Sequence, residues 1–86
     1  MADSPEGGSP MRAVVEVVAK ALVDRPEDVE VIENQRRGMT VVELYTDPGD
    51  MGKIIGRQGR TAAALRTLVT LTAEKAGVRA QLDIRD

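Results

Sequence analysis

The sequence predicts an α+β fold in which three helices pack against one face of a three-stranded sheet. Apolar residues recur with helical spacing in residues 11–23 and 60–76. They alternate with polar residues in 39–46 and 78–84, as expected of half-buried strands. A length of 86 residues suits a single domain. The predicted order is helix, strand, strand, short helix, long helix, strand.

The first helix is expected to follow a short tail. Residues 1–9 are small, polar and acidic, so we expect a flexible acidic tail before a folded domain over 10–86. Ser9 and Pro10 provide an N-cap followed by proline at the first helical position. The helix is predicted from Met11 to Val23. Its core-facing arc is Met11, Val14, Val15, Val17, Val18, Ala21 and Leu22.

Two strands are predicted next. Val29 to Glu33 is rich in β-branched residues, and the polar stretch Asn34 to Gly38 ends in glycine, which suits a hairpin loop. Met39 to Thr46 is the second strand. Val42 and Leu44 share one of its faces, and we expect both in the core.

The second half of the chain contains two helices and a strand. Asp47-Pro48 predicts a short helix that runs to about Ile55, and Gly56 to Gly59 interrupts it. The long helix, Arg60 to Ala76, ends at Gly77. Its predicted core stripe is Leu65, Leu68, Val69, Thr72 and Ala76. Val78 to Ile84 is the last strand.

Composition limits the possible functions. The chain has no cysteine and no histidine, which removes thiolate chemistry and the commonest general base and metal ligand. We therefore expect no catalytic residues, no metal site and no cofactor. No apolar run approaches the length of a membrane span, so we expect a cytoplasmic protein without a membrane partner.

Positive charge is concentrated in one stretch. Between Asp50 and Glu74 there are four basic residues, Lys53, Arg57, Arg60 and Arg66, and no acidic residue. The net charge of the chain is −2, so the remainder carries −6. A local basic patch on an acidic body predicts a site for an anion rather than a general polycation.

The bend Gly56-Arg57-Gln58-Gly59 is the candidate for that site. Glycines allow a polynucleotide backbone to approach, and helix N-terminal amides with arginine side chains favour phosphate. Ile54 and Ile55 point about 100° apart on a helix, so one can enter the core while the other floors a groove for unstacked bases. A tight joint between two helices, with no ligand, is the alternative.

This stretch resembles a known family. Ile54-Ile55 followed by Gly56-Arg57-Gln58-Gly59 resembles the KH signature, and the element order resembles the type II KH fold. The segments 50–60, 65–68 and 21–24 are similar to the KhpA-like small bacterial KH proteins. The resemblance implies single-stranded RNA binding, RNA-chaperone activity in post-transcriptional control of cell-envelope and cell-shape functions, homodimerisation, and pairing with a second, KhpB-like KH protein. Ala62 departs from the bulky aliphatic residue of many KH domains.

Two sets of site residues follow. The candidate RNA contacts are Lys53, Ile54, Ile55, Gly56, Arg57, Gln58, Gly59 and Arg60. A second, small and apolar side of the long helix is a candidate dimer face, formed by Ala64, Thr67, Leu68 and Leu71. If that face mattered and the bend did not, the protein would be a protein-interaction adaptor, which is the alternative function.

Overall fold

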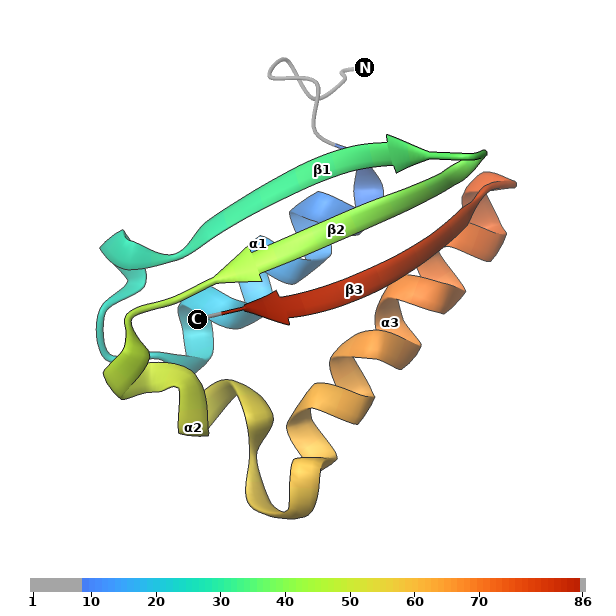
Figure 1. The fold of residues 1–86 in the computed structure, drawn as a ribbon. Coiled ribbons are helices and arrows are strands. Elements are labelled where there is room, and N and C mark those ends of the chain that lie inside the picture. The colour runs from blue at the N-terminus through green and yellow to red at the C-terminus, as the bar shows by residue number, and fades with distance from the viewer. Residues whose placement is uncertain (1–8, 86) are drawn as a thin grey trace.

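The protein is an α+β sandwich with the predicted order of elements (Figure 1). The computed structural model describes residues 9–85, so the predicted tail lies outside the described residues except for Ser9. The helices and strands are α1 (Pro10–Leu22), β1 (Glu30–Arg36), β2 (Met39–Tyr45), α2 (Met51–Ile55), α3 (Arg60–Ala76) and β3 (Arg79–Arg85). Three 3-10 turns lie between them, η1 (Pro26–Asp28), η2 (Pro48–Asp50) and η3 (Arg57–Gly59).

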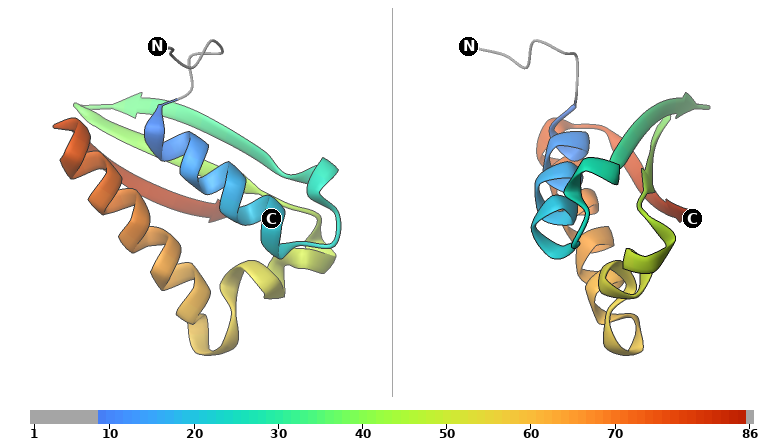
Figure 2. Two further views of the ribbon diagram at one scale, coloured as in Figure 1. Left: turned by 180° about the vertical axis from the view of Figure 1, so that it is seen from behind. Right: turned by 90° about the vertical axis from the view of Figure 1, so that its left-hand side faces the viewer.

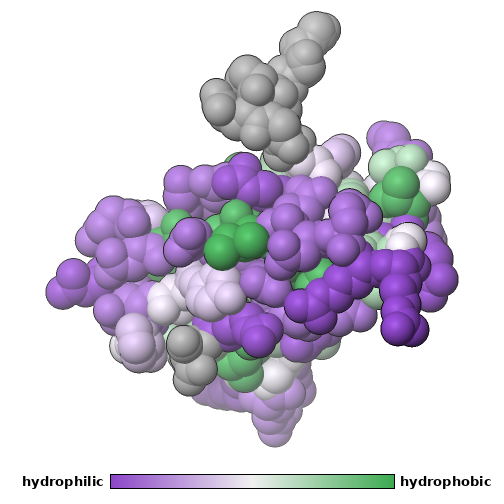
Figure 3. Space-filling view, turned by 45° about the horizontal axis from the view of Figure 1, so that its top comes forward, coloured by the Kyte–Doolittle hydropathy of each residue, from purple (hydrophilic) through white to green (hydrophobic). Residues whose placement is uncertain are grey.

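The sheet is mixed, with β2 in the centre. β2 pairs with β1 in the antiparallel sense and with β3 in the parallel sense. The helices lie on one side of the sheet, and the long helices α1 and α3 run side by side across it (Figure 2). The opposite face is mainly hydrophilic, with small separated hydrophobic areas (Figure 3). Because β2 is central, β3 is an edge strand, and it lies next to α3.

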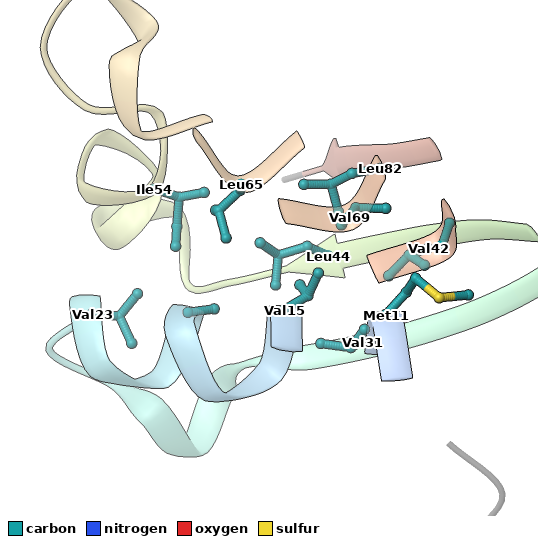
Figure 4. Packing of buried hydrophobic residues seen from close by; sticks show 12 residues of the cluster. Met11, Val15, Val23, Val31, Val42, Leu44, Ile54, Leu65, Val69 and Leu82 are labelled. Atoms are coloured by element: carbon teal, nitrogen blue, oxygen red, sulfur yellow. The ribbon is translucent and has the colours of Figure 1, made fainter. Parts of the chain in front are cut away.

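The central strand supplies the core, as predicted. Val42 and Leu44 are fully buried, and Leu44 lies beside Val15 of α1 while Val42 lies beside Met11 (Figure 4). On the uncovered face, Glu43 is also buried, and it accepts hydrogen bonds of 3.1 Å from Asn34 Nδ2 and the Tyr45 hydroxyl. The hydrogen bond to Glu43 raises the pKa of that hydroxyl. Neighbouring polar side chains thus satisfy a carboxylate buried under them.

The hairpin between β1 and β2 is tighter than predicted. Arg37 and Gly38 have φ values of 51° and 79°, the positive values of a two-residue turn whose twist matches that of the strands. β1 consequently extends to Arg36 instead of ending at Glu33. The turn brings two arginines to the tip of the hairpin.

Both long helices bury a narrower stripe than the sequence predicts. On α1, capped by Ser9, the buried residues are Met11, Val15 and Ala19, whereas Val17 and Leu22 of the predicted arc are exposed. On α3 they are Ala62, Leu65, Val69 and Ala73, and the predicted Leu68 and Ala76 are exposed. Each helix contacts the sheet along positions three or four apart, so a broader apolar arc is only partly covered. Gly77 ends α3 with φ 76°, as predicted.

Val15 and Val17 provide a matched test of this burial. Val15 is completely buried and Val17 is 69% exposed on the same helix. We expect Val15→Ala to lower the free energy of unfolding by about 2 kcal/mol through lost burial and a residual cavity. Val17→Ala should be neutral or slightly stabilising, because alanine is the better helix former. Urea denaturation of both variants measures the difference, and equal effects would contradict this packing.

Candidate nucleic-acid interface

The bend between α2 and α3 depends on an unusual backbone. Gly56 has φ 78° and ψ 171°, a combination that is essentially restricted to glycine. Gln58 and Gly59 follow with φ values of 57° and 74°. A Cβ added at Gly56 would lie 2.7 Å from the Thr61 Cβ and 2.9 Å from the Thr61 backbone nitrogen. The chain thus reverses between the two helices with Thr61 packed directly against Gly56.

The bend presents its polar side chains to solvent. Arg57, Gln58 and Arg60 are all exposed, and neither arginine forms an ion pair with a described acidic residue. The Arg60 guanidinium donates a 3.1 Å hydrogen bond to Gln58 Oε1. This contact positions the guanidinium and leaves the Gln58 amide nitrogen free to donate. The bend therefore carries two uncompensated positive charges and several outward donors.

The backbone amides of the bend divide into two groups. Gly56 N–H donates to Gly52 O at 2.9 Å, Gly59 N–H to Gly56 O at 3.1 Å, and Arg60 N–H to Arg57 O. The amides that open α3 are thus partly used within the chain, which the sequence prediction did not anticipate. The Arg57 and Gln58 amides have no acceptor within residues 9–85. These two amides are the donors available to an incoming anion.

The two isoleucines before the bend have separate roles. Ile54 is fully buried and packs beside Leu65 at one end of the core (Figure 4). It is thus inaccessible to a ligand, which corrects its inclusion among the direct RNA contacts. Ile55 is 37% exposed and is the isoleucine available to floor a groove. Ala62 is buried on the other side of the bend, so its small side chain allows close packing there.

Lys53 is held by acidic residues of the same chain. Its Nζ lies 3.2 Å from Asp24 Oδ2 and 3.8 Å from Asp50 Oδ1. Asp50 is buried, and its carboxylate also accepts hydrogen bonds from the Asp24 and Arg25 backbone amides, at 3.2 and 3.0 Å. Asp50 thereby ties the segment after α1 to the start of α2. A ligand phosphate would have to compete with two carboxylates for Lys53.

A groove lies between α3 and the edge strand β3. Its volume is about 360 Å³, and its lining residues are Arg66, Thr70, Ala80, Gln81, Leu82 and Asp83. The sequence prediction missed this groove, because alternation in residues 78–84 identifies a strand without showing that it lies at the edge of the sheet beside α3. Arg66 places another positive charge without an ion pair on the groove, seven residues beyond Gly59 at the end of the bend.

The candidate dimer face is a separate surface. Ala64, Thr67, Leu68 and Leu71 are exposed on α3, with Leu68 40% and Leu71 55% exposed. Next to it, a hollow of about 540 Å³ is lined by Pro10, Leu71, Thr72, Lys75 and Ala76.

No helix between residues 9 and 85 combines the length and apolar character needed to span a membrane. The same residues contain no cluster of acidic side chains able to hold a metal ion.

Comparison with known proteins gives a consistent family assignment. The model of a family described as "KhpA/KhpB, KH domain" matches residues 12–84. The protein of Halalkalibacterium halodurans named RNA-binding protein KhpA is 50% identical over 76 residues, covering 88% of this chain and 100% of its own. Proteins of the same name from Clostridium perfringens and Aquifex aeolicus are 46% and 45% identical, covering 86% and 88% of this chain and 99% and 96% of their own.

Gly56 and Gly52 provide a matched test of the bend. Gly56→Ala places a Cβ against Thr61 at a backbone angle that alanine disfavours, so we expect it to lower the free energy of unfolding by about 2 kcal/mol or more. Gly52→Ala, in α2 with open space around it, should raise that free energy by about 0.5 kcal/mol. Urea denaturation measures both. A neutral Gly56→Ala substitution would contradict the described bend.

Proposed function

We propose that this chain, which belongs to the KhpA/KhpB KH-domain family, binds single-stranded RNA through the bend Gly56-Arg57-Gln58-Gly59. The observation that carries the proposal is the pair of exposed, uncompensated arginines, Arg57 and Arg60, beside two unpaired backbone amides. Similar proteins named as RNA-binding support the choice of RNA as the ligand.

Each part of the bend has a role in this proposal. Gly56 and Gly59 allow the phosphate backbone to approach the protein backbone. Arg57 and Arg60 hold phosphates by charge-assisted hydrogen bonds, and Gln58 donates from its side-chain amide. Ile55 and the groove between α3 and β3 receive bases that are splayed out of a stack. Lys53 contributes less than the arginines because Asp24 and Asp50 already hold it.

Binding by one such domain is expected to be weak. KH bends clamp about four nucleotides. A weak and exchangeable grip suits an RNA chaperone that acts in post-transcriptional control in the cytoplasm. A second KH domain raises affinity through effective concentration. We propose that a second copy of the chain, or a KhpB-like protein, supplies it through the face of Ala64, Thr67, Leu68 and Leu71.

A protein-interaction adaptor is the second candidate function. It is favoured by one observation, the exposure of Leu68 and Leu71 on the longest helix. In that case the face on α3 would carry the function and the bend would be a structural joint. The two candidates predict opposite effects for substitutions in the two places.

The bend is tested by Arg57→Asp with Gln58→Asp. We expect this double variant to abolish binding of a labelled oligouridine of about four nucleotides, because two negative charges replace the phosphate donors. Fluorescence anisotropy measures binding, and circular dichroism confirms the fold. Leu71→Asp is the control for the adaptor function and should leave this binding unchanged. If RNA affinity falls with Leu71→Asp and persists in the double variant, the assignment to the bend is wrong.

Salt dependence gives the number of phosphates held. If about three phosphates are neutralised, the logarithm of the association constant falls with the logarithm of the salt concentration with a slope of about −2. Arg57→Gln should make this slope shallower by about 0.7, the contribution of one phosphate on a single strand. Lys20→Gln, which removes the same charge from the exposed side of α1, should leave the slope unchanged. A slope near zero for the unmodified protein would exclude a phosphate clamp.

A further inference from the structure

A second group of arginines lies at the opposite end of α3 from the bend. Arg36 ends β1, Arg37 lies in the hairpin turn, and Arg79 begins β3. The sheet register places Met39 between Arg36 and Arg79, with all three on the uncovered face. Because neighbouring strands are about 4.8 Å apart, the two arginine backbones are separated by roughly 10 Å. We call Arg36, Arg37 and Arg79 the hairpin-end cluster.

Most of the positive charges that lack an ion pair lie along α3, at its ends or in the hairpin. Of the twelve lysines and arginines, four form ion pairs with described acidic residues, namely Arg12, Lys20, Lys53 and Arg85. Seven of the other eight lie along α3, at its ends or in the hairpin: Arg36, Arg37, Arg57, Arg60, Arg66, Lys75 and Arg79. Figure 1 shows that the hairpin, the end of α3 and the start of β3 meet, and that the bend lies at the other end of α3.

A depression leads from Arg66, in the first half of α3, to the hairpin-end cluster. The groove that contains Arg66 also contains Thr70 and Ala80. A second hollow of about 220 Å³ shares these two residues and extends to Met39 and Arg79. The depression between α3 and β3 therefore runs from the middle of α3 to the hairpin-end cluster. The surface at this end of the sheet carries strongly hydrophilic residues beside a small hydrophobic area (Figure 3).

The acidic residues along this path do not cancel its charge. Asp83 lines the groove, but Gln81 Nε2 donates to it at 3.3 Å and the Arg85 guanidinium lies 3.9 Å from it. Glu74 lines the second hollow. Against Glu74 stand the three arginines of the hairpin-end cluster, which leaves a charge of +2 at this end of the depression, while Lys75 lines the separate hollow beside Pro10. Unpaired arginines in this arrangement favour an extended polyanion that also follows the groove.

We propose that an RNA strand held at the bend continues along the depression between α3 and β3, and that the hairpin-end cluster is a second phosphate-binding site for the same strand. This inference rests on the proposed RNA binding at the bend and lengthens its footprint beyond four nucleotides. Arg66 lies between the two sites and contacts the connecting nucleotides. Guanidinium groups bind phosphates in a bidentate manner without reading bases, so the second site adds affinity and salt dependence without sequence preference.

The test compares a short and a long oligouridine, of about 4 and about 12 nucleotides, within the range that single-strand-binding grooves accommodate. The variant replaces Arg36, Arg37 and Arg79 with glutamine, and Lys20→Gln is the control. We expect unchanged affinity for the short oligouridine and weakened affinity for the long one. The salt slope for the long oligouridine should become shallower by about 2, three phosphates at about 0.7 each. When salt is raised fourfold, from 50 to 200 mM, the loss of affinity for the long oligouridine should therefore be about 16-fold smaller for the triple variant than for the unmodified protein.

Several outcomes would overturn the inference. If the triple variant binds the long oligouridine like the unmodified protein, the cluster does not hold this strand. Two copies of the chain bridged by one RNA would then explain any effect of RNA length. A protein partner would explain the charge of the cluster. Equal weakening of both oligouridines would mean that the substitutions act through the fold. Failure of the proposed RNA binding at the bend would give a different result from failure of this inference. In that case Arg57→Asp with Gln58→Asp would retain binding of the short oligouridine, whatever the triple variant does.

Discussion

The candidate site depends on one backbone constraint, the reversal of the chain between α2 and α3 at Gly56. Its angles are essentially restricted to glycine, and Thr61 occupies the space that a side chain would need. Gln58 and Gly59 continue the bend with positive φ values. This geometry leaves the Arg57 and Gln58 amides without acceptors in the described chain, and it places the arginine side chains in solvent. Without the reversal, the donors and charges would not converge on one anion.

Buried residues on both sides of the exposed bend anchor it to the core. Ile54 and Ala62 are buried on either side of it, and Leu65 packs beside Ile54. Asp50 adds a polar tether, because its buried carboxylate joins the start of α2 to the backbone after α1. These anchors limit the conformational freedom that a ligand would otherwise have to remove, and preorganisation of this kind favours binding. The hydrogen bond between Arg60 and Gln58 extends the same ordering to a side chain.

The sequence predicted those features that depend on local chemistry. The caps at Ser9 and Gly77, the order of elements and the burial of Val42 and Leu44 are all confirmed. Features that depend on tertiary placement were missed or wrong. Periodicity did not show that Ala19 is buried while Val17 and Leu68 are exposed, because the covered stripe depends on where each helix meets the sheet. The pairing of Lys53 with Asp24 joins residues far apart in the sequence, and the groove beside β3 depends on the order of strands.

Amide NMR during titration with an oligouridine of about four nucleotides is the sharpest test of RNA binding at the bend, because it reports where RNA contacts the chain. We expect the largest chemical-shift changes at the Arg57 and Gln58 amides, with smaller changes at Ile55 and along the groove near Arg66. Changes confined to the face of Ala64, Thr67, Leu68 and Leu71, with the Arg57 and Gln58 signals unmoved, would contradict it.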